Sequence, residues 1–148
     1  MLVTGSSRGI GRAIALRLAQ DGWQVALHYG ADAADAERVQ KELGKNAAGL
    51  YQADLSHPDR ASKLIEEALK DGPMNALVNN AGVYMPLDFA EASKPVFSAN
   101  WHKTMAVNFE SPTLLMRALL PHFFKNGGGK ILNVASRVGF RGEGGASI

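Results

Sequence analysis

Short apolar runs alternate with longer amphipathic segments from one end of the chain to the other. The apolar runs predict β-strands, and apolar residues spaced three and four apart between them predict helices. The expected strands cover residues 1–3, 24–29, 48–52, 76–79 and 130–135. The expected helices cover about 9–21, a segment from Asp32 or Asp35 to Gly44, about 56–72, and a long region, 95–125, that breaks or bends near Pro112.

The helix after Ser56 has the clearest pattern. Ser56 and Asp59 resemble a capping box, and Gly72-Pro73 provides the stop. Its inward stripe consists of Ala61, Leu64, Ile65, Ala68 and Leu69. The same periodicity places Ile10, Ile14 and Leu18 on one side of the first helix, and Ala36, Val39 and Leu43 on the inward side of the second.

Strands that alternate with helices predict right-handed parallel crossovers, so the expected fold class is α/β with a doubly wound, Rossmann-like sheet. We expect one domain over residues 1–148, with five strands in the order 3-2-1-4-5. The first two helices then cover one face and the later helices cover the other. The ligand crevice lies at the carboxyl ends of strands 1 and 4, and strand 5 is left as an apolar open edge.

The composition is that of a globular protein, with 46% hydrophobic and 20% charged residues, a net charge of +2 and no cysteine. Disulfides and thiolate metal sites are therefore excluded, and the four histidines show no metal-ligand spacing. No basic run is interleaved with aromatic residues, so we expect no nucleic-acid partner. No apolar stretch reaches the ~20 residues that span a bilayer and no signal-peptide pattern is present, so we expect no membrane association and a cytoplasmic location.

Three glycines lie between the first strand and the first helix. They follow the pattern T-G-x-x-x-G-x-G, formed by Thr4, Gly5, Gly9 and Gly11. Such a turn lets the backbone approach a phosphate, which then meets unpaired N–H groups and the positive end of the helix dipole. The pattern differs from the common G-x-G-x-x-G fingerprint and on its own also fits a plain tight turn. Its position between a strand and a helix favours a dinucleotide site.

The segment Gly5-Ser6-Ser7-Arg8-Gly9 also matches G-x-S-x-G, the nucleophile elbow of α/β-hydrolases. In this alternative Ser7 is the nucleophile, and Ser7→Ala abolishes ester cleavage. The elbow requires preceding strands that supply its oxyanion loop, and the sequence begins at Met1. We therefore expect the dinucleotide site rather than the hydrolase.

The choice of dinucleotide depends on the end of the second strand. NAD-binding folds usually place an acid there for the ribose 2′-hydroxyl, whereas NADP requires a cation and no acid. This strand ends with Tyr29-Gly30 and has no acid before Asp32, while Arg8 in the glycine turn can form charge-assisted bonds to a 2′-phosphate. We expect NADP(H) rather than NAD(H), although a solvated Arg8 is the plainer alternative. Asp54 either accepts a hydrogen bond from the adenine amino group or caps the next turn.

Together these residues resemble the short-chain dehydrogenase/reductase family, closest in style to the 3-oxoacyl-acyl-carrier-protein reductases. Five motifs fall in order along the chain: Thr4 to Gly11, Asp54-Leu55, Asn79-Asn80-Ala81-Gly82, Met105-Ala106-Val107-Asn108, and Ile131-Leu132-Asn133-Val134-Ala135-Ser136 followed by Gly139. The resemblance covers the whole chain.

The resemblance implies a role for each motif. The glycine turn, with Thr4, Gly5, Ser7, Gly9, Ile10 and Gly11, would hold the pyrophosphate, and Arg8 would hold the 2′-phosphate. Asp54 and Leu55 would meet the adenine, and Asn80, Ala81 and Gly82 would line the adenosine side of the crevice. Ser136 would hydrogen-bond a substrate carbonyl, and Asn108 would hold a water in a proton relay. The plainer alternatives are a strand-end serine and a helix-bending asparagine.

The chain departs from the family pattern at the acid/base. The family uses a tyrosine in a Tyr-x-x-x-Lys motif soon after the serine, because a phenol needs a nearby cation to work at neutral pH. Tyr29, Tyr51 and Tyr84 have no lysine four residues on, and the motif would fall just after Ile148. We expect the chain to be the N-terminal part of a longer reductase, without the remaining strands, the substrate loop and the helices through which the family usually forms homo-oligomers.

The resemblance implies hydride transfer between NADP(H) and a small molecule, interconverting a ketone and a secondary alcohol. The alternative is a catalytically inactive dinucleotide-binding fragment that lacks the Tyr-x-x-x-Lys acid/base. Binding of NADPH without its consumption would favour the fragment.

Overall fold

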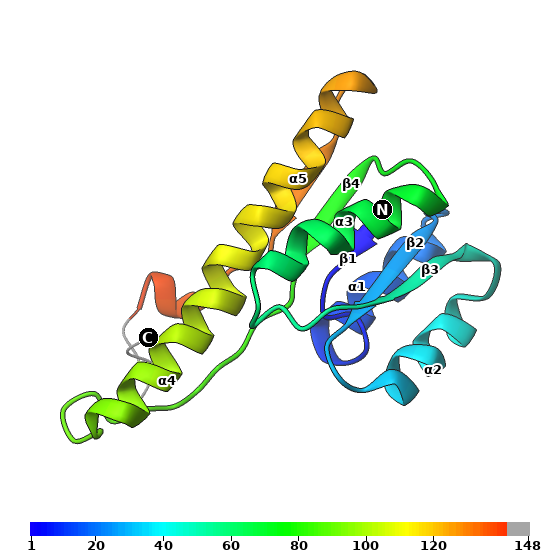
Figure 1. Ribbon diagram of the computed structural model, residues 1–148. Coiled ribbons are helices and arrows are strands. Elements are labelled where there is room, and N and C mark those ends of the chain that lie inside the picture. Colours follow the sequence, from blue (N-terminus) through cyan, green and yellow to red (C-terminus); the bar gives the residue numbers. More distant parts are fainter. Residues whose placement is uncertain (142–148) are drawn as a thin grey trace.

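The computed structural model describes residues 1–141 and contains a five-stranded parallel sheet in the order β3-β2-β1-β4-β5, as predicted (Figure 1). The strands are β1 (Leu2–Val3), β2 (Val25–Tyr29), β3 (Ala47–Gln52), β4 (Ala76–Asn79) and β5 (Lys130–Asn133). The helices are α1 (Gly9–Gln20), α2 (Ala33–Leu43), α3 (Asp59–Asp71), α4 (Lys94–Met105) and α5 (Ser111–Lys125). Short 3₁₀ turns cover Gly44–Asn46 and Arg137–Gly139, and Ala106–Glu110 is a π-helical segment.

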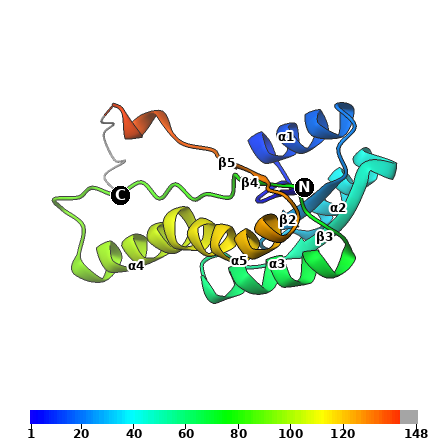
Figure 2. The same ribbon diagram turned by 90° about the horizontal axis from the view of Figure 1, so that it is seen from above.

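The core consists of two apolar layers, one on each face of the sheet. Successive strand residues point to opposite faces, so Leu2 and Val3 belong to different layers. Val3 packs with Val39 of α2, whereas Leu2 packs with Leu64 of α3 and Leu119 of α5. Figure 2 shows α1 and α2 on one side of the sheet and α3 and α5 on the other. The predicted distribution of helices over the two faces is confirmed.

The predicted limits of α2 are also confirmed. Asp32 is the N-cap residue, and its side chain accepts a hydrogen bond from the N–H of Asp35 at 3.2 Å. Gly44 follows the last helical residue with a φ of 56°. The inward positions Ala36, Val39 and Leu43 are all buried, as their spacing predicts.

The start of α3 differs from the prediction. The helix begins at Asp59, its N-cap position is Pro58, and no side chain caps it, so the capping box of Ser56 and Asp59 is wrong. The physical reason is competition, because Ser56 gives both its N–H and its hydroxyl to Asp54. The apolar stripe is confirmed, since four of its five members are buried and Leu69 packs against them.

The long helical region after residue 93 is broken as predicted, but the irregular segment Ala106–Glu110 comes just before Pro112. Pro112 lies in the first turn of α5, where a missing N–H is tolerated. It has no N–H for the carbonyl of Asn108, four residues earlier, so the α-helical bonding pattern cannot pass through this point. The side chain of Asn108 instead pairs with Val83, outside the helix.

The outer strand β5 is exposed at all four of its positions. Leu132 is 55% exposed and Val134, just beyond the strand, is 39% exposed. The predicted apolar edge is therefore present in the structure. Among residues 1–141, no helix has the length and apolar character that crossing a membrane would require.

Candidate functional site

The turn between β1 and α1 requires glycine at both of its ends. Gly5 has a φ of 62°, and a Cβ there would lie 2.9 Å from the Cα of Ala81. A Cβ on Gly11 would overlap with the carbonyl oxygen of Gly5 and with the side-chain amide of Asn80. Gly9 also has a positive φ, 56°, but its missing side chain faces open space. The turn thus packs closely on its inner side and leaves the N-terminus of α1 open to a ligand.

Side-chain hydrogen bonds tie this turn to the segment after β4. Thr4 Oγ1 accepts from the N–H groups of Asn80 and Ala81, each at 3.0 Å, and donates to the carbonyl of Val78 at 3.3 Å. Asn80 Nδ2 donates to the carbonyls of Thr4 at 2.9 Å and of Gly5 at 3.1 Å. The crevice predicted between strands 1 and 4 is present, and these bonds join its two walls.

His28 in β2 is a residue of the site that the sequence analysis missed. Its Nδ1 accepts a hydrogen bond from the N–H of Gly5 at 3.0 Å, and its Nε2 lies 3.0 Å from the carbonyl oxygen of Ala53. Burial lowers the pKa of His28, because desolvation outweighs the bond to Ala53, which favours the charged form. No motif spacing signals this residue. The predicted strand order offers one clue: His28 lies near the end of β2, the strand next to β1.

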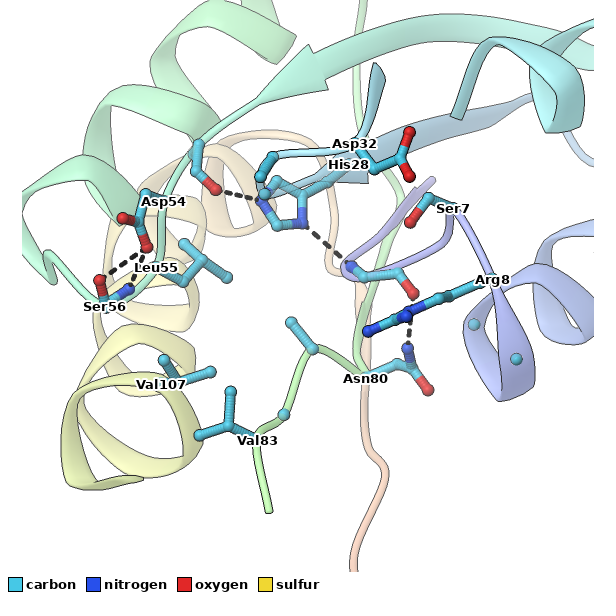
Figure 3. Close-up of a pocket in the computed structure, with 18 of the residues that line it drawn as sticks. Ser7, Arg8, His28, Asp32, Asp54, Leu55, Ser56, Asn80, Val83 and Val107 are labelled. Atoms are coloured by element: carbon cyan, nitrogen blue, oxygen red, sulfur yellow. Dashed lines mark hydrogen bonds between the residues drawn. The ribbon is translucent and has the colours of Figure 1, made fainter. Parts of the chain in front are cut away.

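A cavity of about 560 Å³ lies at the carboxyl ends of β1, β2 and β3 (Figure 3). Eleven of the predicted cofactor residues line it: Gly5, Ser7, Arg8, Gly9, Ile10, Gly11, Asp54, Leu55, Asn80, Ala81 and Gly82. The twelfth, Thr4, is buried beneath the turn. Residues that are up to about 80 positions apart in the sequence thus border one cavity, as the predicted topology requires.

The first turn of α1 presents one charged and one apolar side chain to this cavity. Arg8 is the N-cap residue, has an extended backbone, and makes no side-chain bond to the helix end. Ile10 lies about one turn before Ile14 and two turns before Leu18; those two residues pack against the core, whereas Ile10 is 67% exposed. Ile10 lines this cavity and a second one.

Asp54 borders the cavity on the side of β3 and caps the turn that follows it. Its Oδ1 accepts from the hydroxyl of Ser56 at 2.7 Å and from the Ser56 N–H at 3.0 Å. The Ser56 hydroxyl, more than any other group, lowers the pKa of the Asp54 carboxyl. Oδ2 lies 3.8 Å from Nε2 of His57. Capping therefore occupies one carboxylate oxygen, and the adenine role stays a prediction.

Asp32 also lines this cavity, on the side of β2. It is exposed and caps α2, three residues beyond the end of the strand. The cavity therefore contains both an arginine in the glycine turn and an acid after β2.

A second cavity, of about 820 Å³, contains the two predicted catalytic residues, Ser136 and Asn108. It shares Ile10, Asn80 and Gly82 with the first cavity, so the two are neighbours. Ser136 is exposed, and its Oγ accepts from the N–H of Val138 at 3.3 Å.

The side chain of Asn108 is bonded at both of its polar atoms. Its Oδ1 accepts from the N–H of Val83 at 2.8 Å, and its Nδ2 donates to the Val83 carbonyl at 2.9 Å. This pairing fits the alternative of an asparagine that accompanies a bend in the helix. The relay role of Asn108 stays a prediction.

The geometry at Ser7 does not match a nucleophile elbow. An elbow serine sits on a strained turn and is hydrogen-bonded to a histidine. Among residues 1–141, every residue with a positive φ is a glycine, so Ser7 has no such strain. His28 borders the same cavity, but both of its ring nitrogens are engaged with backbone groups.

Comparison with known proteins decides the family. A family model described as "short chain dehydrogenase" matches residues 1–148. The chain belongs to the short-chain dehydrogenase family. This match confirms the predicted family, and the strand order of the sheet confirms the predicted fold.

Among the relatives of this short-chain dehydrogenase chain is the 3-oxoacyl-[acyl-carrier-protein] reductase FabG of Staphylococcus epidermidis. It is 31% identical over 145 residues, which are 96% of this chain and 58% of the relative. An NADPH-dependent aldehyde reductase-like protein of Arabidopsis thaliana chloroplasts is 34% identical over 148 aligned residues, 91% of this chain and 54% of the relative. The chain spans about half the length of the curated relatives it matches.

Solved structures agree with this assignment. A 3-oxoacyl (acyl-carrier-protein) reductase from Agrobacterium tumefaciens C58, solved with NADP bound, superposes with a TM-score of 0.88 and is 30% identical. The match covers 99% of this chain and 55% of that structure. The superposed part of this chain includes the residues of both cavities. The chain therefore has the same fold as this NADP-bound reductase.

Proposed function

We propose that this chain forms the dinucleotide-binding part of an NADP(H)-dependent oxidoreductase that interconverts a ketone and a secondary alcohol. The observation that carries the proposal is the pair of adjoining cavities. One contains the glycine turn and Arg8, the other contains Ser136 and Asn108, and Ile10 borders both. A dinucleotide lying across both cavities would bring its reactive ring beside Ser136.

The residues present fit such a cofactor. Gly9 faces open space at the start of α1, so a pyrophosphate can approach the N–H groups and the positive dipole end of the helix there. Arg8 would bind the 2′-phosphate, with Ser7 in the same turn. Asp54, with Leu55 beneath it, would meet the adenine. Thr4 and Asn80 would act from beneath, by fixing the backbone that makes these contacts.

NADP(H) is preferred over NAD(H) because of where the two charged groups lie. Arg8 is free of bonds to the helix end, whereas one oxygen of Asp32 already caps α2. A guanidinium forms charge-assisted and bidentate bonds to phosphate. The NADP-bound Agrobacterium relative and the NADPH-dependent Arabidopsis relative support the same choice.

The proposed chemistry assigns few tasks to this chain. When bound, the cofactor would supply the hydride for the carbonyl carbon of a small-molecule substrate. Ser136 would donate a hydrogen bond to the carbonyl oxygen of the substrate. Asn108 would hold a water molecule in a proton relay. The proton itself has to come from an acid that Tyr29, Tyr51 and Tyr84 do not provide by pattern. Burial and the Asp71 carboxylate raise the pKa of Tyr51, which further removes it from this role.

A second candidate is a dinucleotide-binding fragment without turnover. The observation in its favour is that none of Tyr29, Tyr51 and Tyr84 is followed by a lysine four residues on. A longer protein that includes this chain would cover the exposed edge strand β5, and we propose that it is a homo-oligomer in the cytoplasm.

One experiment separates the two candidates. NADPH binding is measured by calorimetry, and NADPH consumption is followed by absorbance with a panel of ketones. Binding with consumption would support the oxidoreductase, and binding without it would support the fragment. A folded chain that binds neither NADPH nor NADH would contradict both.

A further inference from the structure

His28 lies between the two parts of the proposed cofactor site. One ring nitrogen contacts Gly5 in the glycine turn, and the other contacts Ala53, the residue before Asp54. Both distances are 3.0 Å, and the residue is only 2% exposed. A single side chain thus connects the pyrophosphate side of the cavity with its adenine side (Figure 3).

The two contacts fix the protonation of the ring. The N–H of Gly5 points at Nδ1, so Nδ1 has to be the unprotonated acceptor. Nε2 then carries the hydrogen and donates it to the carbonyl of Ala53. The backbone of His28 is held as well, because its N–H donates to the hydroxyl of Ser6 at 3.0 Å and its carbonyl accepts from the Ser6 N–H at 2.9 Å.

We propose that His28 is the positioning residue of the cofactor site: in its neutral Nε2–H form it holds the glycine turn in the shape that binds phosphate, and its protonation removes cofactor affinity. This inference rests on the proposed function.

Protonation would place two donors face to face. The hydrogens on Nδ1 and on the N–H of Gly5 would then point at each other, and neither would have an acceptor. The free-energy cost of such a buried, unpaired donor exceeds the stabilisation that the original hydrogen bond provides. The charged side chains of the same cavity are Arg8 in the turn, Asp32 and Asp35 after β2, Asp54 after β3, and Lys103 in α4. Within residues 1–141 neither ring nitrogen is bonded to any of them, so the turn itself would have to move.

Two substitutions separate the two ring contacts. In His28→Asn, Oδ1 takes the place of Nδ1 and can still accept from Gly5, but nothing reaches Ala53. In His28→Gln, Nε2 takes the place of the ring Nε2 and can still donate to Ala53, but no acceptor faces Gly5. The asparagine variant also has no titrating group at this position.

The test is calorimetric titration of the whole chain with NADPH from pH 8 to pH 5, for the wild type and both variants. Thermal unfolding in the absence of NADPH verifies that each variant is folded. At pH 8 we expect His28→Asn to bind within about threefold of the wild type and His28→Gln about tenfold more weakly. The 2′-phosphate also titrates near pH 6. The wild type is therefore compared with His28→Asn at each pH, which removes the cofactor's own contribution.

The pH at which the wild type loses affinity should match the titration of His28, followed by NMR of its ring protons. One pH unit below that midpoint, the wild type should have lost about tenfold more affinity than His28→Asn. Equal losses in the two proteins, or no His28 titration before the chain unfolds, would overturn the inference. So would a folded His28→Gln that binds like the wild type. If the wild type binds no NADPH at pH 8, the proposed function fails instead.

Discussion

The turn after β1 and the segment after β5 each carry residues of the candidate site, but the two regions are held very differently. Thr4 and Ser6 are fully buried and hydrogen-bonded to β2 and to the segment after β4. The residues of β5 and of the segment after it, from Lys130 to Arg137, are all exposed. The contrast indicates that the shape of the glycine turn is fixed by contacts within the chain. The second cavity, in contrast, is bounded partly by exposed residues.

The largest expected effect is on the free energy of unfolding, and it distinguishes the buried core from the exposed strand β5. Leu119→Ala should lower the free energy of unfolding by about 3 kcal/mol, because Leu119 is completely buried and the cavity it leaves cannot collapse fully. Leu132→Ala, in exposed β5, should change it by less than about 0.5 kcal/mol. Urea unfolding measures both. Similar losses for the two variants would show that β5 is packed as firmly as the core.

The glycine turn should tolerate no side chain at its closest point. Gly11→Ala should lower the free energy of unfolding by about 2 kcal/mol and weaken NADPH binding, because its Cβ would overlap with Gly5 and Asn80. Gly139→Ala is the matched control, since a Cβ there meets nothing within 4 Å. Unfolding in urea and calorimetric titration measure the two effects. An unchanged Gly11→Ala protein would contradict the close packing of this turn.

Arg8 should act on one dinucleotide more than on the other. Arg8→Ala should weaken NADPH binding by about 10- to 100-fold and leave NADH binding nearly unchanged, because the lost bonds go to the 2′-phosphate. Arg117→Ala is the control, since Arg117 is an exposed residue of α5 that borders neither of the two cavities. Calorimetric titration with both dinucleotides gives the result. An equal loss of affinity for NADPH and NADH would show that Arg8 does not contact the 2′-phosphate.

Acid should destabilise the wild type more than His28→Asn. Because burial lowers the pKa of His28 in the folded chain, the unfolded chain binds a proton first as the pH falls below about 6.5. The stability linked to His28 is therefore present above pH 6.5 and declines below it, by at most about 1.4 kcal/mol at pH 5.5. Urea unfolding at pH 7.5 and pH 5.5 measures the difference. Identical pH dependence in the two proteins would mean that His28 is not buried in the neutral form.

The smallest effect is expected at Ser136. Ser136→Ala should change the free energy of unfolding by less than about 0.5 kcal/mol and NADPH affinity by less than about twofold, since the side chain is exposed and lines only the second cavity. The same titrations provide the measurement. A large loss of either quantity would show that the two cavities are coupled more tightly than the structure indicates.

Most of the fold could be predicted because hydrophobic periodicity and the crossover rule act on every element at once. Residues 76–79 were expected as a strand and form β4 with the same limits. The helix faces followed from the same rule. The helix starts that depend on competing side-chain bonds could not be predicted: Ser56 bonds back to Asp54 instead of capping α3, and no pattern distinguishes the two choices.

The candidate site shows the same limit. Glycines and asparagines next to strand ends signal close backbone contacts, so the walls of the first cavity could be located from the sequence. His28 could not, since its role depends on two backbone groups, Gly5 and Ala53, which follow the ends of two other strands. The pairing of Asn108 with Val83 likewise depends on how a π-helical segment turns one side chain, which spacing does not encode.

The most direct test of the account is an NMR titration of the chain with NADPH. Amide signals of Gly5 to Gly11, of Ala53 to Leu55 and of Asn80 to Gly82 should shift together, because these three segments border one cavity. Signals on the far ends of α3 and α5 should stay in place. Shifts confined to other parts of the chain, or no shifts in a folded protein, would contradict the claim that this turn is a preformed dinucleotide site.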